Sequence, residues 1–230
     1  MGLRATCALA KVCTTMNGQE PEIDQPPSLI RRFAQNLDDG EVVAFPTETF
    51  YGLLARIDRP QALARVFALK GRNFHQPLPV ITADADTARR LWAQVPDPAE
   101  KLIEFFWPGP LTIVLPATDK VDNMVTGQTG KVGVRVPGSA AARGIAALAK
   151  QALAATSANP SDRPPARSAA EVRVYFDDDV IIAEGSELPP SRGSTVVDLS
   201  GWPPVLLRAG DISIERLQSA LGVELQGGIR

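Results

Sequence analysis

The sequence Phe45-Pro46-Thr47-Glu48-Thr49-Phe50-Tyr51-Gly52-Leu53 continues the apolar run Val42–Phe45. A run of this kind predicts a buried strand, which Pro46 ends, and Gly52 favours a tight turn. Two threonine hydroxyls, a carboxylate and a phenol therefore lie where a strand passes into a loop. Because α/β proteins bind small ligands at the ends of their strands, this stretch predicts a ligand site.

A second group of polar residues follows as Lys70-Gly71-Arg72, at the C-terminal end of a helix predicted over residues 60–70. An ammonium and a guanidinium two residues apart suit a polyphosphate. The same residues also make an ordinary helix C-terminus, because glycine and basic side chains are favoured there. Taken alone, each motif therefore leaves a structural and a functional interpretation open.

Composition places the chain among ordinary globular proteins. Its 230 residues, 44% hydrophobic and 22% charged, are enough for one well-buried domain. The formal net charge of −2 gives no overall attraction to nucleic acid or to a membrane surface, so any anion site must come from a local group of cations. Cys7, Cys13 and the single His75 predict neither a disulfide framework nor a metal site. No apolar run suits a membrane-spanning helix, and we expect a reducing cytoplasm.

Predicted helices and strands alternate along the chain, without repeats or a long linker, which indicates one α/β domain with a mixed sheet. We expect a flexible tail over residues 1–27, with Met16 as a possible start, the domain over 28–222 and a frayed end over 223–230. A polar loop is predicted over residues 117–131. Helices are predicted over 28–39, 60–70, 84–93, 98–106 (capped by Asp97) and 139–150 and from Ser168 and Ser213, and strands over 41–45, 77–82, 111–115, 132–136, 153–155, 180–183, 195–199 and 205–208.

The order of the motifs resembles that of the YrdC-like L-threonylcarbamoyladenylate synthases, over residues 28–220. That family opens with Pro-Thr-(Asp/Glu)-Thr-x-Tyr-Gly-Leu and continues with Lys-x-Arg and a Pro-Leu strand. The resemblance implies a twisted mixed sheet with flanking helices and a concave ligand face, in the short, TsaC-type single-domain form. The later matching segments are Trp107-Pro108-Gly109-Pro110-Leu111-Thr112, Val132-Gly133-Val134-Arg135-Val136-Pro137, Thr156-Ser157-Ala158-Asn159, Ser194-Thr195-Val196-Val197-Asp198 and Arg208-Ala209-Gly210.

The resemblance also implies a reaction. A nucleotidyltransferase of this family joins L-threonine, bicarbonate or CO2, and ATP into threonylcarbamoyl-AMP and releases pyrophosphate, for t6A37 modification of tRNA. ATP would be a substrate that brings its own Mg²⁺, because no protein cage for the metal is predicted. A separate tRNA threonylcarbamoyl transferase would be the downstream partner, and direct tRNA binding would be weak. Such chemistry requires positioning and charge stabilisation, without a nucleophile on the protein.

Roles for individual residues follow from the resemblance. Lys70 and Arg72 are the expected catalytic residues. Arg135 lies inside an apolar strand, where a charge is costly unless it is paired, so it lies at an exposed edge, pairs with an acidic residue or clamps a substrate carboxylate. Glu48 is a candidate for an amine or magnesium-water contact, although one carboxylate makes a poor metal site. ATP contacts are expected from Lys70, Arg72, Gln76, Lys131, Ser157, Asn159, Arg167 and Arg208, and threonine contacts from Thr49, Arg135, Ser157 and Ser194.

Three residues depart from the family pattern. Asn73 replaces a proline that is common after Lys-x-Arg, Asp162 stands where Ser-Gly is usual, and Ile81 stands where some relatives carry a histidine near threonine. Asp162 and Asn73 keep open a nucleotide-binding module without turnover. An RNA-binding module is a further alternative, although no basic run is interleaved with aromatic residues. A third is a carbamoyl-transfer module of hydrogenase maturation.

Overall fold

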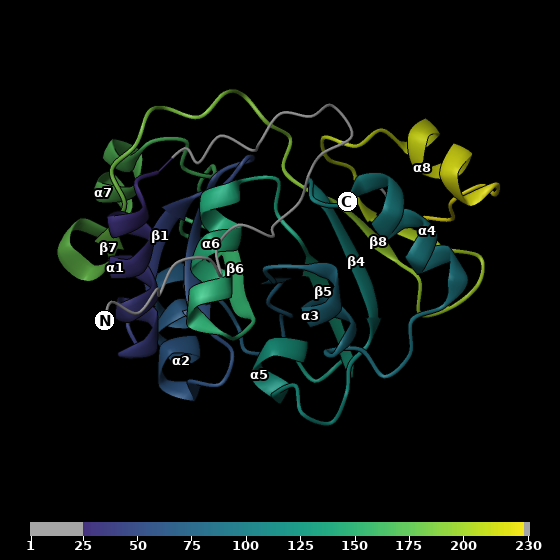
Figure 1. The fold of residues 1–230 in the computed structure, drawn as a ribbon, viewed down its shortest axis with the longest axis horizontal. Helices are drawn as coiled ribbons and strands as arrows, with labels where there is room; N and C mark the ends of the chain where they lie inside the picture. The colour runs from purple at the N-terminus through teal and green to yellow at the C-terminus, as the bar shows by residue number, and fades with distance from the viewer. Residues whose placement is uncertain (1–24, 228–230) are drawn as a thin grey trace, which may run out of the picture.

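The computed structural model describes residues 25–227, and predictions about residues 1–24 and 228–230 lie outside that range. Its centre is a nine-stranded sheet with the strand order β7-β1-β2-β6-β3-β5-β4-β8-β9. The sheet mixes parallel and antiparallel pairs and carries helices on its faces, which confirms the predicted fold class (Figure 1). The strands are β1 (Val43–Pro46), β2 (Tyr51–Arg56), β3 (Val80–Ile81), β4 (Leu111–Pro116), β5 (Lys131–Arg135), β6 (Leu153–Ser157), β7 (Ile181–Ile182), β8 (Thr195–Asp198) and β9 (Val205–Arg208).

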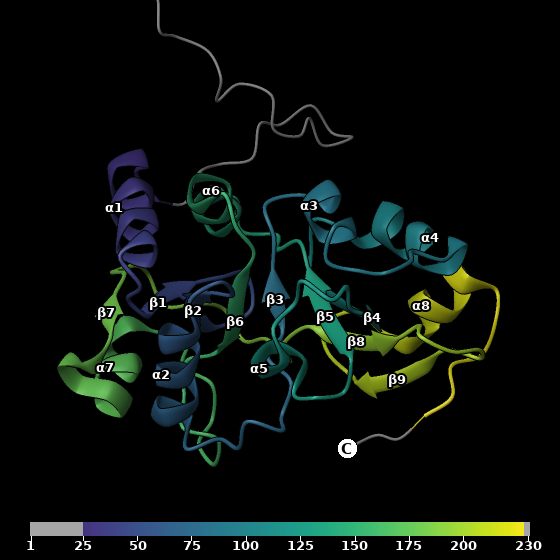
Figure 2. The ribbon, with the colours of Figure 1, turned by 90° about the horizontal axis from the view of Figure 1, so that it is seen from below.

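The helices divide between the two sides of the sheet. Along one side lie α1 (Pro27–Asp38), α6 (Ala140–Ala149), α3 (Ala85–Arg89) and α4 (Asp97–Phe106), whereas α2 (Pro60–Lys70) and α7 (Ala169–Phe176) lie on the other (Figure 2). The buried faces of α1 and α6 pack over β1, β2 and β6 and close one apolar core there. The remaining helical segments are α5 (Asn123–Thr126), η1 (Asp177–Asp179) and α8 (Ile214–Leu221). Within residues 25–227, no helix has the length and apolar character needed to cross a membrane.

The opening motif forms a β-hairpin. Thr47 closes the turn, because its Oγ1 donates a hydrogen bond to Phe50 O (2.8 Å) and accepts one from Thr49 N (3.2 Å). Gly52 was predicted to lie in a turn, and that prediction is wrong, since Gly52 belongs to β2 and pairs with Phe45 of β1. The hydroxyl-closed turn before it already reverses the chain, and strand β2 begins directly afterwards.

Strand pairing brings distant motifs to one face of the sheet. Strand β2 pairs antiparallel with β6, and this aligns Gly52 of the opening motif with Ser157. Strand β3 pairs antiparallel with β6 and parallel with β5, where Ile81 aligns with Arg135. Strands β4, β8 and β9 follow on the far side of β5. Sheet order therefore determines which motifs become neighbours, and separation along the chain does not.

Most predicted elements are present with shifted ends, and four predictions need correction. Strand β3 is limited to Val80–Ile81, because the chain before it runs along α5 without strand pairing. Helix α3 ends at Arg89, and the loop 117–131 contains the one-turn helix α5. The predicted cap Asp97 is already the first residue of α4, which follows Pro96 without a side-chain cap.

One predicted helix cap is confirmed, and one unpredicted backbone pairing lies at the edge of the sheet. Ser168 caps α7 as predicted, because its Oγ accepts a hydrogen bond from Glu171 N at 3.2 Å. Near the C-terminus, Gln226 forms a parallel bridge with Val205, and its carbonyl accepts a 2.7 Å hydrogen bond from Leu206 N. The chain therefore adds backbone pairing beside β9 after α8.

Gly210 marks a close crossing of two backbone segments. A Cβ at this position would lie 2.3 Å from Gly193 O and 2.4 Å from Thr195 N, so Gly210→Ala must push the segments apart. We expect a loss of about 3 kcal/mol, or roughly 5–10 °C in Tm, measured by thermal unfolding. Gly201→Ala is the control, since its Cβ would meet nothing within 4 Å. Equal melting temperatures for the two variants would contradict the predicted clash.

Candidate active site

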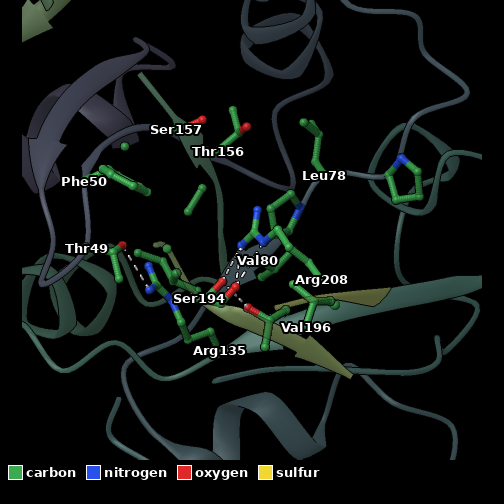
Figure 3. A pocket seen from close by; sticks show the side chains of 18 of the residues that line it. Thr49, Phe50, Leu78, Val80, Arg135, Thr156, Ser157, Ser194, Val196 and Arg208 are labelled. Carbon is green, nitrogen blue, oxygen red and sulfur yellow. Dashed lines mark hydrogen bonds between the residues drawn. The ribbon is translucent and has the colours of Figure 1, made fainter. Parts of the chain in front are cut away.

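One cavity of about 730 Å³ opens on the concave face of the sheet, between the end of α2 and strands β5, β4 and β8 (Figure 3). All the residues predicted to contact ATP or threonine line it except Arg167, and the candidate Glu48 does not line it either. Their common surroundings confirm that the scattered motifs build a single hollow. The predicted residues that line the cavity are Thr49, Lys70, Arg72, Gln76, Lys131, Arg135, Ser157, Asn159, Ser194 and Arg208.

Lys70, the last residue of α2, is 4% exposed and sits against the end of β6. Its Nζ donates hydrogen bonds to Ser157 O (2.7 Å), Asn159 O (2.7 Å) and Asn159 Oδ1 (3.4 Å). Burial, and to a smaller extent the charge of Arg72, lower the pKa of Lys70 to about 8. The ammonium therefore fixes the Ser-Ala-Asn segment and supplies a cation whose charge depends on pH near neutrality.

Arg72 follows Gly71, whose left-handed backbone (φ 58°) ends α2 and turns the chain toward the cavity. Its Nε donates to Gln76 Oε1 (2.8 Å) and its Nη2 donates to Pro77 O (3.1 Å). Burial lowers the pKa of Arg72 from the usual arginine value. Gln76 thus orients Arg72 and lines the same cavity.

Asn159 is 5% exposed and holds the loop after β6 in place. Its Nδ2 donates to Pro160 O (2.7 Å) and Arg163 O (2.6 Å), so both amide hydrogens are bonded to backbone carbonyls of the loop. Ser161 was not predicted, yet it lines the cavity, and its Oγ donates to Lys70 O at 3.0 Å. A hydroxyl two residues beyond Ser-x-Asn was the available signal for it. The end of α2 and this loop therefore form one hydrogen-bonded unit.

The other end of the cavity holds Arg135, which is 8% exposed. Its Nη1 donates to Glu48 Oε1 (3.1 Å) and lies 3.4 Å from Thr49 Oγ1. The exposed-edge interpretation of Arg135 is wrong, because the residue is buried in an inner strand. The other two are compatible, since one nitrogen pairs with a carboxylate while the side chain lines the cavity. Glu48 itself is absent from the cavity wall, so its predicted contact with a ligand amine or hydrated magnesium is not supported.

Arg208 and Ser194 form a second polar group near Arg135. Arg208 Nη2 donates to Ser194 Oγ (2.7 Å) and to Ser194 O (2.8 Å), and Nε donates to the same carbonyl (3.0 Å). The hydroxyl of Thr112, not predicted as a site residue, lies 3.0 Å from Ser194 Oγ. Burial, and then repulsion by Arg135, lower the pKa of Arg208. Two guanidinium groups thus lie near each other, which favours an anionic ligand between them.

Strands β4, β5 and β8 also contribute residues to the cavity lining, among them Val114, Gly133 and Val196. Gly133 has no side chain, and a Cβ there would lie 3.1 Å from Thr112 Cγ2 and 3.3 Å from Val114 Cγ2. At the rim, Lys131 Nζ pairs with Asp198 Oδ2 at 2.9 Å. Burial opposes ionisation of Asp198, but hydrogen bonds from Ser200 and Lys131 outweigh it and lower the pKa. Lys131 is therefore paired across the sheet.

Comparison with known proteins identifies the family. The model of the Sua5, YciO and YrdC family, described as "Telomere recombination", matches residues 35–210. The chain belongs to this family. A Pyrococcus abyssi member called threonylcarbamoyl-AMP synthase is 40% identical over 194 residues, which are 84% of this chain and 57% of the relative. A Halorhodospira halophila protein of the same name is 42% identical over 150 residues, or 65% of this chain and 78% of the relative.

Solved structures of Sua5/YciO/YrdC proteins share the fold. The crystal structure of P. abyssi Sua5 complexed with L-threonine superposes with a TM-score of 0.82 at 38% identity, covering 86% of this chain and 58% of that one. Escherichia coli YciO superposes with a TM-score of 0.77 at 22% identity, which supports the fold alone. The chain spans little more than half the length of the Pyrococcus relatives that it matches.

Within this family member, Arg167 does not reach the cavity. Its Nε and Nη2 donate to Leu188 O (3.0 and 2.6 Å), and Nη2 also pairs with Glu187 at 3.0 Å. The structure therefore gives the expected ATP contact of Arg167 no support, because its guanidinium is used to fasten the segment after β7. The sequence showed only an arginine in a Pro-rich loop, which does not predict where the side chain points.

The three departures from the family pattern lie in different surroundings. Asn73 Oδ1 accepts a hydrogen bond from His75 N (2.9 Å) and shapes the loop that carries Gln76. Asp162 is exposed and does not line the cavity. Ile81 does line it, at 2% exposure, and presents an apolar surface there. Of the three departures, the exposed Asp162 therefore does not alter the lining of the cavity.

Proposed function

We propose that this chain is a threonylcarbamoyl-AMP synthase, which joins L-threonine, bicarbonate or CO2, and ATP into threonylcarbamoyl-AMP and pyrophosphate. The observation that carries the proposal is that two cationic groups line one cavity. Lys70 and Arg72 lie at one end, and Arg135 and Arg208 lie at the other. A triphosphate and an amino acid carboxylate are the anions that such a pair of sites would hold side by side.

The reaction follows from that arrangement. The threonine nitrogen adds to CO2 and loses a proton, which gives a carbamate. A carbamate oxygen then attacks the α-phosphorus, the new O–P bond forms, and the bond to the bridging oxygen breaks, so pyrophosphate leaves. Lys70 and Arg72 would stabilise the phosphate charge that develops in this step. Arg135 would hold the threonine carboxylate, with Thr49 and Ser194 as neighbouring hydroxyl donors.

Magnesium would arrive with ATP. Residues 25–227 contain no group of three or more His, Cys, Asp or Glu side chains that could hold a metal ion. A triphosphate can instead supply most of the ligands that Mg²⁺ needs. The product would pass to a tRNA threonylcarbamoyl transferase in the cytoplasm, for t6A37 modification of tRNA.

The test is pyrophosphate release by the purified chain with Mg-ATP. We expect release only when both threonine and bicarbonate are present, and mass spectrometry should detect threonylcarbamoyl-AMP. Omitting either substrate should reduce the rate to background. Nucleotide binding without threonine-dependent turnover would instead favour the nucleotide-binding module. Salt-sensitive binding of RNA without ATP turnover would favour the RNA-binding module.

A further inference from the structure

Glu48 is the one charged residue of the opening motif, and the mechanism above gives it no role. Its neighbours Thr47 and Thr49 line the cavity, as does Arg135, whereas Glu48 does not. Its side chain is 22% exposed and contacts Arg135 from behind the cavity wall. A carboxylate in that place does not line the cavity, but it can control the arginine that does.

The carboxylate of Glu48 bridges Arg135 and the beginning of α6. Oε1 accepts a hydrogen bond from Arg135 Nη1 (3.1 Å), and Oε2 accepts one from the backbone N–H of Ser139 (3.2 Å). Ser139 is the N-cap of the ten-residue helix α6, where the helix dipole favours a negative charge. Each carboxylate oxygen therefore has its own donor, and the side chain has a defined position.

Further hydrogen bonds hold the segment that contacts Glu48. Arg143, in α6, donates from Nη1 to Pro137 O (2.7 Å) and to Gly138 O (2.6 Å), which holds the turn between β5 and α6. Gly138 allows a close approach, because a Cβ there would lie 3.2 Å from Glu48 Cγ and 3.4 Å from its Cδ. Helix α6 and the turn before it therefore hold the Glu48 carboxylate, which in turn holds Arg135.

This arrangement leaves part of Arg135 available to a ligand. Glu48 and Thr49 contact only Nη1, and within residues 25–227 no protein acceptor bonds Nε or Nη2. The Nε–Nη2 edge of a guanidinium can bind a carboxylate with two parallel hydrogen bonds. By engaging Nη1 alone, Glu48 fixes the rotation of the group and keeps that edge open. It also offsets the repulsion between Arg135 and Arg208.

We propose that Glu48 is a positioning residue, which holds Arg135 from the N-terminus of α6 so that its free edge meets the carboxylate of the amino acid substrate. This inference rests on the proposed function. It predicts a defect in amino acid binding and little change at the phosphate end, where Lys70 and Arg72 are held by other contacts.

Glu48→Gln is the first test. The amide keeps the shape and can still accept from Ser139 N, but it loses the charge that orients Arg135. We expect KM for threonine to rise about tenfold or more, while KM for ATP stays within about twofold and kcat at saturating threonine changes little. Threonine binding by calorimetry should weaken by the same factor. Glu100→Gln, which breaks an ion pair with Arg89 away from the cavity, is the matched control.

Gly138→Ala is the second test, and it leaves both charges in place. The new methyl group must push the Glu48 side chain by a few tenths of an ångström, so threonine should bind roughly two- to fivefold more weakly. Gly201→Ala, with nothing near its Cβ, should behave as the wild type. This variant also decides the matter if Glu48→Gln does not fold.

The results for the variants test the role of Glu48, whereas the results for the wild type test the proposed function. Unchanged or tighter threonine binding in both variants would overturn the role of Glu48, because Glu48 would then be neutral or a competitor for Arg135. Equal losses for threonine and ATP would show a general structural effect and also overturn it. Absence of threonine binding by the wild type would overturn the proposed function, and the inference with it.

Discussion

Lys70→Ala is expected to lower ATP-dependent turnover by about a hundredfold or more. The substitution removes the cation that would neutralise the phosphates. It also removes three hydrogen bonds that hold the Ser157 and Asn159 segment at the cavity wall. Because the lost cation acts on the phosphates, KM for ATP should rise together with the fall in kcat. Threonine binding in the absence of ATP should change much less, through the Ser157 segment alone.

The control for this variant is Lys101→Ala, which removes an exposed lysine of α4. It should retain wild-type kinetics. A Lys70→Ala protein with a native melting temperature and more than about a tenth of the wild-type kcat would remove Lys70 from its catalytic role.

The charge of Lys70 should make the affinity for ATP depend on pH. With a pKa of about 8 in the free protein, the ammonium is present at pH 7 and is lost as the pH rises through 8. A bound triphosphate favours the ammonium and raises its pKa, so binding takes up a proton above pH 8. Affinity for a Mg-bound, non-hydrolysable ATP analogue should therefore fall as pH rises above 8. The fall should be absent in Lys70→Ala, and an identical pH dependence in both proteins would count against this assignment.

The sequence predicted the two ends of the cavity better than its middle. Lys70, Arg72 and Arg135 stand out locally, as cations at a helix end and inside an apolar strand. Their meeting depends on β6 lying between β2 and β3, with β5 beyond β3. Local periodicity carries no information about that order, and the family resemblance implied only that these residues share one ligand face.

Other features needed long-range geometry that no local pattern contains. The pairing of Lys131 with Asp198 joins residues of β5 and β8, which are separated by β4. The contact between Thr112 and Ser194 likewise crosses from β4 to the start of β8. Strand β2 was missed because Gly52 and the preceding Pro46 favour a turn, whereas the turn itself is closed by the Thr47 hydroxyl. Arg167 was misplaced because a loop arginine has many partners within reach, and here Leu188 is the partner.

Arg135→Ala is the second substitution with a large expected effect. It deletes the only cation of strand β5 that is buried, and with it the proposed contact to the threonine carboxylate. We expect KM for threonine to rise about a hundredfold, with KM for ATP within a few-fold of the wild type. The ratio of the two changes is the useful measurement, because a folding defect would affect both substrates.

Two companion variants separate the reasons for that loss. Arg135→Ala leaves Glu48 without its partner, and a partly buried unpaired carboxylate is costly in its own right. The double variant Glu48→Gln/Arg135→Ala removes that cost, so it should regain thermal stability but not threonine binding. Arg135→Lys keeps the charge and loses the two-pronged geometry, and it should give an intermediate KM. Arg89→Ala, which breaks ion pairs with Asp86 and Glu100 outside the cavity, is the control. If the double variant recovered threonine affinity, the charge of Glu48 would be the obstacle and Arg135 would not be the carboxylate clamp.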